Sequence, residues 1–211
     1  MGGGFGEALT PVRGAVQVRA VRRGVFRVMI GGERDSRGSM ALLTREQIEE
    51  ALASLDAELG RAGQRASIHI VGGAAMCLVF RARESTRDID AWFAPASAVR
   101  AAAARVAATL DLPADWLNDA AKAFVPPGAG FEAWRSLAHL DIFVADAETL
   151  LAMKCAAART QEDSADIRLL ADRLGLTSSA AALAVVTKYY PEDRLPVRTR
   201  LLLEELLDDG S

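Results

Sequence analysis

Two aspartates, Asp88 and Asp90, are the residues of this chain whose type and spacing best suit chemistry. They belong to the segment Asp-Ile-Asp-Ala-Trp-Phe, which is typical of a β-strand. Because side chains alternate between the two faces of a strand, both carboxylates are expected on one face, roughly 6.5 Å apart. Like charges at that distance repel each other unless a cation lies between them, and Mg²⁺ is a hard cation that carboxylate oxygens bind. The alternative is a pair of acids on a solvated strand face.

A pair of glycines, Gly72 and Gly73, precedes the aspartates and directly follows the β-branched run Ser-Ile-His-Ile-Val. Glycine allows backbone N–H groups to approach a phosphate closely where a strand turns into a helix. The same turn also occurs without any ligand. Followed by the two acids, however, the glycines predict a site for phosphoryl or nucleotidyl transfer.

A third acid, Asp141, lies in the apolar segment Leu-Asp-Ile-Phe-Val, which predicts a further strand. An unpaired carboxylate is costly to bury. Asp141 is therefore expected either to face solvent on an edge strand or to meet Asp88 and Asp90 on one face of a sheet. In the second arrangement, three carboxylates could hold two Mg²⁺ ions about 3.5–4 Å apart, and the third could accept the proton of an attacking hydroxyl.

The elements that must position these acids alternate between helix and strand in the first half of the chain. A capping box of Thr44 and Gln47 starts a helix that is expected to end near Leu59. Strands are expected over 67–71, 88–93 and 137–144, and further helices over 74–80, 96–110, 115–124, 147–159, 163–174, 178–188 and 196–208. The pattern predicts an α+β (mixed α/β) fold, with a small mixed sheet flanked by helices and a helical C-terminal half.

The composition of the 211 residues narrows the classes of function. Half of the residues are hydrophobic, but no run of about 18 apolar residues predicts a membrane span. Neither Cys77 nor Cys155 belongs to a metal-binding cluster, so zinc is not expected. We therefore expect a cytoplasmic protein without a membrane partner. The net charge of -3 confines any RNA contact to a local basic patch, for which the candidates are Arg81, Arg83, Arg87, Lys188, Arg194, Arg198 and Arg200.

The order of these motifs resembles the DNA polymerase β-like nucleotidyltransferase superfamily. A Gly72-Gly73 pair is followed by Thr86-Arg-Asp88-Ile-Asp90 and then by a strand aspartate. More narrowly, the chain is similar to the AbiEii-type branch, which includes toxins of bacterial toxin–antitoxin pairs and their mycobacterial relatives. The segments that carry this likeness are 83–90, 116–124, 151–159 and 163–170, and the resemblance covers roughly residues 44–176.

The resemblance implies a role for each matching residue. Gly72, Gly73 and Thr86 would bind the nucleotide, although the family often has a serine at the position of Gly73. Lys154 would contact the triphosphate as a point charge. The implied metal ligands are Asp88, Asp90 and Asp141, and the implied catalytic residues are Asp88, Asp90, Asp141, Lys154 and Asp166.

Residues 1–40 are rich in Gly and Arg and show no clear periodicity, which predicts a disordered or weakly structured extension. The resemblance implies a polymerase β-like core over 41–146, and the helical patterns predict a helical region over 147–211. The implied activity is Mg²⁺-dependent transfer of a nucleoside monophosphate from an NTP to an acceptor hydroxyl, with two Mg²⁺ ions. The implied acceptor is the 3′ end of a tRNA, and the implied partner is a cognate antitoxin. Two alternatives remain open: a protein or small-molecule hydroxyl as acceptor, and a catalytically silent fold that binds a nucleotide or a partner.

Overall fold

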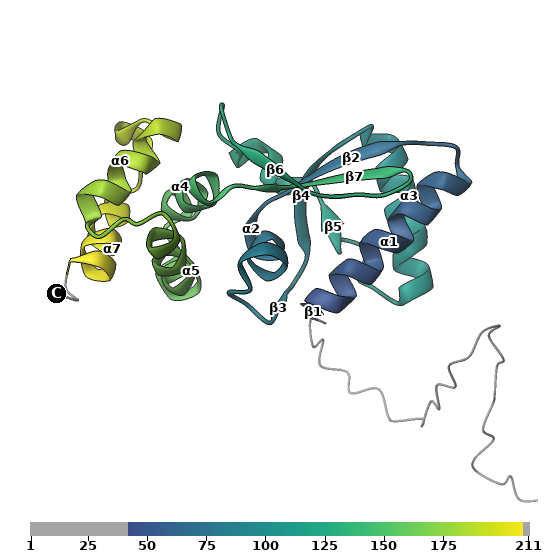
Figure 1. Ribbon diagram of the computed structural model, residues 1–211, viewed down its shortest axis with the longest axis horizontal. Helices are drawn as coiled ribbons and strands as arrows, with labels where there is room; N and C mark the ends of the chain where they lie inside the picture. The colour runs from purple at the N-terminus through teal and green to yellow at the C-terminus, as the bar shows by residue number, and fades with distance from the viewer. Residues whose placement is uncertain (1–41, 209–211) are drawn as a thin grey trace, which may run out of the picture. The chain divides into compact units, whose positions relative to one another are not determined.

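The computed structural model describes residues 42–208, except for the side chains of residues 160 and 161. The expectation for residues 1–40 lies outside this part of the chain. Residues 42–208 form seven α-helices, a five-stranded mixed sheet and a two-stranded sheet (Figure 1). The predicted α+β fold is therefore confirmed.

Within the described residues, all strands lie before residue 146. The elements of this part are β1 (Leu43–Thr44), α1 (Arg45–Arg61), β2 (Ala66–Ile70), α2 (Gly72–Ala75), a π-helical turn (Met76–Phe80), β3 (Ser85–Thr86), β4 (Ile89–Ala94), α3 (Ala96–Leu110), β5 (Leu117–Asn118), a 3₁₀ turn (Ala120–Phe124), β6 (Phe131–Ser136) and β7 (Leu140–Ala145). The predicted capping box is present, because Thr44 Oγ1 accepts a hydrogen bond from Gln47 N and Gln47 Oε1 accepts one from Thr44 N.

The prediction of an α-helix over 115–124 is wrong. The segment instead forms β5 and a 3₁₀ turn, because its backbone pairs with the sheet: Ile89 N donates a hydrogen bond to Trp116 O at 2.7 Å. The Trp116 ring is fully buried and donates from Nε1 to Ala103 O at 3.1 Å. Strand β6 was not expected from the sequence, because few of its side chains are buried and its apolar residues do not alternate cleanly.

The five-stranded sheet has the order β5-β4-β2-β7-β6. Strand β2 runs antiparallel to β4 and parallel to β7, and β6 runs antiparallel to β7. The register places Ile70 opposite Ala91, at the end of β2 that leads into Gly72. It places Ser67, near the other end, opposite both Ala94 and Asp141. The two ends of the sheet therefore carry different acids.

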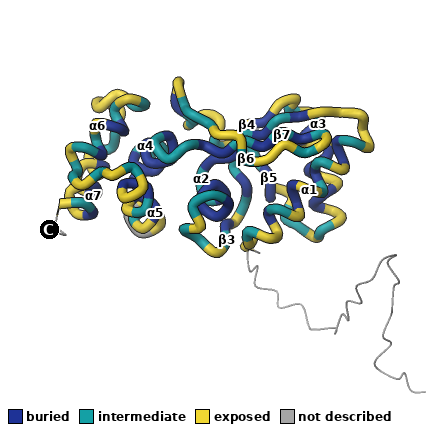
Figure 2. Tube along the Cα trace, in the orientation of Figure 1, coloured by how far each residue is buried: buried dark blue, intermediate teal, exposed yellow. Residues whose placement is uncertain are grey.

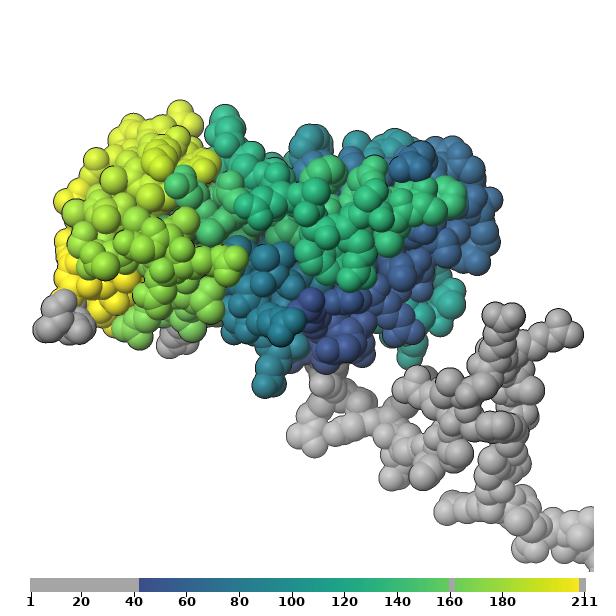
Figure 3. Space-filling view, viewed as in Figure 1, coloured from purple at the N-terminus to yellow at the C-terminus, as the bar shows by residue number. Residues whose placement is uncertain are grey.

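The two faces of the sheet differ in burial. Side chains such as Ile68, Ile70 and Ile142 are fully buried and belong to the core formed with α1, α2 and α3. The alternate residues, His69, Trp92 and Phe143 among them, lie on the opposite face and are half-buried or exposed. Figure 2 shows edge strand β6 mostly in the colour of exposed residues. Edge strand β6 lies at the molecular surface, where Figure 3 draws it in teal-green. One face of the sheet is thus a core face and the other is open.

The chain after residue 146 is helical, as predicted. It contains α4 (Ala147–Ala157), α5 (Thr160–Arg173), α6 (Ser179–Tyr189), a 3₁₀ turn (Glu192–Arg194) and α7 (Val197–Leu207). Side-chain oxygens of Asp146 and Ser178 cap α4 and α6. Among the helices of residues 42–208, none has both the length and the apolar character that crossing a membrane requires.

Candidate active site

Asp88 and Asp90 lie where the chain enters β4, next to the short strand β5. Because β5 pairs in parallel with β4, Asn118 is the register partner of Asp90. The Asn118 side chain donates from Nδ2 to Asp88 Oδ2 at 2.9 Å and accepts from Ala120 N at 3.0 Å. These two bonds orient the amide, so its donor side faces the acids. Asn118 is thus a site residue, although it stood in the sequence only as part of the 116–124 motif.

The surroundings of the two acids disfavour their charged forms. Burial raises the pKa of Asp88. The hydrogen bond from Asn118 lowers this pKa, and the negative charge of Asp115 raises it, so the net shift is upward. Burial also raises the pKa of Asp90, and the charge of Asp88 raises it further. Two partly desolvated carboxylates that repel each other are the electrostatic situation that a bound cation relieves.

The glycine pair packs against the strand that carries the acids. Gly72 has φ 64, in the left-handed region that glycine adopts readily, and a Cβ there would lie 3.3 Å from Asp90 Oδ2. A Cβ on Gly73 would lie 2.5 Å from Thr86 Oγ1. The serine common in the resembling family therefore does not fit at position 73, because Thr86 fills that space. Thr86 is nearly buried behind the glycines.

Lys154 is buried, with 5 % of its side chain exposed. Its Nζ lies 2.8 Å from Asp163 Oδ1 and 2.6 Å from Asp166 Oδ2. The two acids are one turn apart on α5, so both reach the lysine from the same face of that helix. Their side chains are no more than 2 % exposed. Asp166 therefore acts on Lys154 rather than on a ligand directly.

Two arginines complete this charge cluster. Arg83 donates from Nε to Asp166 Oδ1 at 3.1 Å and from Nη2 to Glu162 O at 2.5 Å. Arg159 donates from Nε to Asp163 Oδ2 at 3.1 Å. Three cations thus surround two buried acids, and Arg159 also lies 3.4 Å from a carboxylate oxygen of the exposed Glu162. Arg83 and Arg159 lie at the ends of the 83–90 and 151–159 motifs. Arg83 was expected only as part of a basic patch for RNA, whereas the structure pairs it with Asp166, and Arg159 was not singled out.

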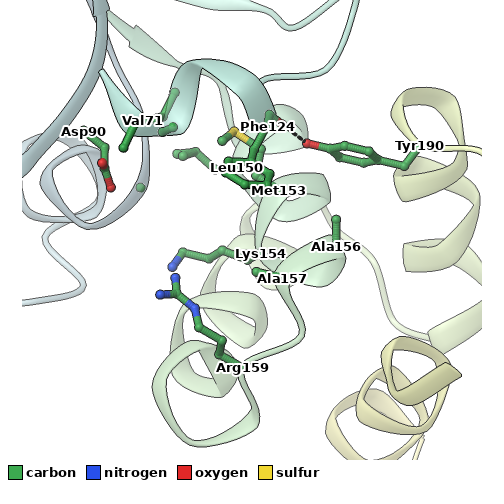
Figure 4. A pocket seen from close by; sticks show the side chains of 13 residues that line it. Val71, Asp90, Phe124, Leu150, Met153, Lys154, Ala156, Ala157, Arg159 and Tyr190 are labelled. Carbon is green, nitrogen blue, oxygen red and sulfur yellow. Dashed lines mark hydrogen bonds between the residues drawn. The ribbon is translucent and has the colours of Figure 1, made fainter. Parts of the chain in front are cut away.

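A pocket of about 460 Å³ joins the strand end to the helices. Its polar side is formed by Asp90, Lys154 and Arg159, and Figure 4 shows both cationic groups pointing toward the side where Asp90 lies. The remaining wall is mostly apolar and is lined by Val71, Gly72, Ala120, Ala121, Phe124, Leu150, Met153, Ala156, Ala157 and Tyr190.

Tyr190 closes the apolar end of the pocket. Its hydroxyl donates to Phe124 O at 2.5 Å, the dashed line in Figure 4. Burial raises the pKa of Tyr190 to about 12, so the hydroxyl stays protonated near neutral pH and keeps this bond. The bond ties the chain after α6 to the 3₁₀ turn beside β5, so the two segments meet at this end of the pocket.

The structure brings most of the predicted site residues together. Gly72, Asp90 and Lys154 line one pocket, and Asp88 precedes Asp90 on the same side of the strand. Gly73, Thr86 and Asp166 lie behind these residues and support them.

Asp141 is the exception, and the predicted convergence of three carboxylates is wrong. In the sheet register Asp141 is level with Ala94, four residues along β4 from Asp90, which corresponds to about 13 Å. Asp141 Oδ1 accepts a hydrogen bond from Ser136 Oγ, and Asp141 Oδ2 lies 3.7 Å from Arg65 Nη2. Alternation correctly predicts the face of the sheet, but the direction of β7 decides at which end the acid lies.

The carboxylates at this end of the sheet suit a Mg²⁺ site with two protein ligands rather than the predicted three. Within residues 42–208, no group of three His, Cys, Asp or Glu side chains is placed to hold a metal ion. Mg²⁺, however, commonly takes one or two carboxylates and completes its shell with water and substrate phosphates. Asp88 and Asp90 supply that pair of hard oxygen ligands, whereas a three-carboxylate site for two ions does not fit.

Comparisons with protein-family models, with curated proteins and with solved structures find no match for this chain.

Proposed function

We propose that this chain is a Mg²⁺-dependent nucleotidyltransferase, which moves a nucleoside monophosphate from an NTP to an acceptor hydroxyl. The observation that carries the proposal is a single pocket lined by Asp90, Gly72 and Lys154. It combines a carboxylate suited to a metal, a glycine that leaves room beside that carboxylate, and a buried cation. The order of the motifs in the sequence supports the same reaction.

The pocket suits a nucleoside triphosphate in size and in chemistry. Its volume of about 460 Å³ lies in the range of small-molecule sites, which are mostly apolar with a few polar groups. Lys154 has three N–H donors, of which two face Asp163 and Asp166, so the third can bind a phosphate oxygen. Arg159 adds a second cation, and Phe124 and Tyr190 offer an apolar end for the base.

Asp88 and Asp90 would hold Mg²⁺ together with oxygens of the triphosphate. When bound, the ion would neutralise the charge of the phosphates and of the departing pyrophosphate. The hydrogen bond from Asn118 fixes the rotamer of Asp88, so the two carboxylates stay on one side of the strand. Asp88, Asp90 and Asn118 thus form the metal end of the site.

In the reaction, the oxygen of the acceptor hydroxyl forms a bond to the α-phosphorus of the NTP. The bond from that phosphorus to the oxygen bridging the α- and β-phosphates breaks, and pyrophosphate leaves with its electron pair. The hydroxyl proton passes to Asp90, the carboxylate that lines the pocket. Lys154 and Arg159 stabilise the negative charge on the leaving group.

The acceptor that the resemblance implies is the 3′ end of a tRNA, and the implied biological role is that of a toxin with a cognate antitoxin. A protein or small-molecule hydroxyl is the alternative acceptor. The same pocket also suits a protein that binds a nucleotide without transferring it, so catalysis has to be measured separately from binding.

The experiment is a transfer assay with the full chain, α-labelled NTPs, Mg²⁺, total tRNA and a cell lysate. We expect label on tRNA, and a loss of at least about a hundredfold for Asp90→Asn, because the variant removes a ligand and a proton acceptor from the pocket. Asp141→Asn is the matched control and should transfer label at the wild-type rate. Label on protein alone would exclude the tRNA acceptor, and NTP binding without any transfer would exclude the enzyme.

A further inference from the structure

The segment around Asn118 is anchored on both sides of that residue. Before it, the buried Trp116 ring donates from Nε1 to Ala103 O at 3.1 Å. After it, a carboxylate oxygen of Asp119 lies 2.6 Å from Arg100 Nη2. Both contacts are made with α3, and they hold a strand that has only two residues. The position of Asn118 is therefore fixed by more than the pairing of β5 with β4.

The Asn118 amide presents its nitrogen, not its oxygen, to the two acids. Its Oδ1 accepts the hydrogen bond from Ala120 N at 3.0 Å, which leaves the NH₂ group for the carboxylates. Nδ2 donates to Asp88 Oδ2 at 2.9 Å. Burial raises the pKa of Asp90, and the Asn118 amide acts in the opposite direction, so its influence extends to both acids. Asn118 is thus a neutral donor placed beside a pair of carboxylates.

The place of the amide nitrogen would suit a third oxygen ligand. Mg²⁺ binds oxygens at about 2.0–2.1 Å in an octahedron, so two neighbouring ligands lie about 3 Å apart. The separation between Asn118 Nδ2 and Asp88 Oδ2 is 2.9 Å. An oxygen in place of that nitrogen could therefore share an ion with Asp88, whereas the N–H group of an amide cannot bind Mg²⁺.

A role of Asn118 confined to the 3₁₀ turn makes a different prediction. The bond from Ala120 N needs only an oxygen, which aspartate supplies as well as asparagine does. The bond to Asp88 needs an N–H group, which an ionised aspartate lacks. Asn118→Asp therefore keeps the contact with the turn and replaces the donor beside the acids with a third carboxylate.

We propose that Asn118 is a positioning residue that takes the place of a third carboxylate and thereby limits the metal site to two protein ligands. This inference rests on the proposed function and adds how the site depends on its substrate. Asp88 and Asp90 leave most of the octahedral shell to water and to the oxygens of a triphosphate. Firm binding of Mg²⁺ consequently requires the NTP.

The test uses Mg²⁺ alone, with the full chain and without NTP. A thermal-shift titration gives the affinity from the rise in Tm with Mg²⁺ concentration. Asn118→Asp should tighten binding about tenfold or more, because a third carboxylate adds a ligand and a charge. Asn118→Ala should weaken binding about 10- to 100-fold, the usual loss when a group that orients a metal ligand is removed. General damage would instead weaken binding in both variants.

A second readout follows the amide itself. Asn118 is the only asparagine in the sequence, so isotopically labelled asparagine gives a single side-chain amide signal in an NMR spectrum. Adding Mg²⁺ should shift this signal with the affinity found in the thermal titration. Asp90→Ala, which removes a proposed metal ligand, should abolish the shift. A signal that does not respond to Mg²⁺ in the wild type would overturn the inference.

Gln64→Glu is the matched control. It makes the same change from amide to carboxylate at an exposed position before β2, at the end of that strand away from the glycines, and should bind Mg²⁺ as the wild type does. Equal affinities of Asn118→Asp and Gln64→Glu would overturn the inference, as would an unchanged affinity of Asn118→Ala.

These outcomes are distinguishable from those of the transfer assay. A wild type that transfers label, together with equal Mg²⁺ affinities in all variants, would overturn the role of Asn118 and leave the enzyme standing. Tighter Mg²⁺ binding by Asn118→Asp in a protein that transfers no label would support the role of Asn118 and exclude the enzyme.

Discussion

The ammonium of Lys154 lies 2.8 Å from a carboxylate oxygen of Asp163, and both side chains are almost fully buried. A buried ion pair of this kind holds a charge at a fixed point beside the pocket. Asp166, Arg83 and Arg159 surround the pair and share its charges. The geometry therefore makes Lys154 both a candidate phosphate ligand and a structural link between α4 and α5.

Asp163→Ala should destabilise the fold strongly. The change removes the buried acid that Lys154 and Arg159 share, and breaking a buried pair in this way costs about 3–5 kcal/mol. Urea unfolding followed by circular dichroism measures the loss. Glu192→Ala, which breaks the exposed pair with Arg200, is the control and should cost no more than about 1 kcal/mol. Equal losses in the two variants would contradict the structural role of the cluster.

Mg²⁺ should stabilise the wild type in the absence of nucleotide, because it relieves the repulsion between Asp88 and Asp90. At ten times the dissociation constant, one bound ion adds about 1.4 kcal/mol. For a chain of this size, that is a rise of about 3–6 °C in Tm. Asp90→Asn should lose this rise and Asp141→Asn should keep it in a thermal-shift titration. If Asp141→Asn also lost the rise in Tm, the result would support the three-carboxylate site instead.

Gly73→Ala should destabilise the protein, and a second change should rescue it. The new Cβ would lie 2.5 Å from Thr86 Oγ1, and overpacking of this kind costs about 1–3 kcal/mol. Thr86→Ala removes that oxygen, so the double variant should be more stable than Gly73→Ala alone. A double-mutant cycle of unfolding free energies measures the coupling. Additive effects of the two changes would show that the contact is not tight.

His69 should make stability depend on pH. Burial beside the rings of Trp92 and Phe143 lowers the pKa of His69 below its ordinary 6.5. Its folded form therefore stays neutral while the unfolded chain takes up a proton. The free energy of unfolding should fall as the pH drops below 6.5 and should level off below the folded pKa. His69→Phe keeps a ring and cannot titrate, so the difference between the two curves isolates this residue; parallel curves would contradict the assignment.

Much of the fold could be predicted from local patterns. The capping box at Thr44 and the alternation around His69 and Asp90 give elements that agree with the structure within a few residues. Strands β5 and β6 could not be predicted, because β5 has two residues and is formed only by pairing with β4, whereas β6 buries little of its surface.

The candidate site could be predicted in part. Short motifs fixed the spacing of Gly72, Asp90 and Lys154, and the structure places them around one pocket. The position of Asp141 could not be predicted, because local sequence patterns do not give the direction of β7 relative to β2. In the structure the two strands are parallel, so Asp141, near the start of β7, lies at the end of the sheet away from the glycines. Arg83 and Asn118 act through contacts with segments that are distant in sequence, and such contacts leave no local pattern.

Arg83 reaches from the loop before β3 to the carboxylate of Asp166 and to the backbone of Glu162. The boundary expected at residue 146 therefore runs through the site rather than beside it. A chain cut there would separate an arginine from its acids and remove one wall of the pocket. The strands and the C-terminal helices of residues 42–208 are therefore one structural unit, and exchanging only one of them would break the ion pair between Arg83 and Asp166.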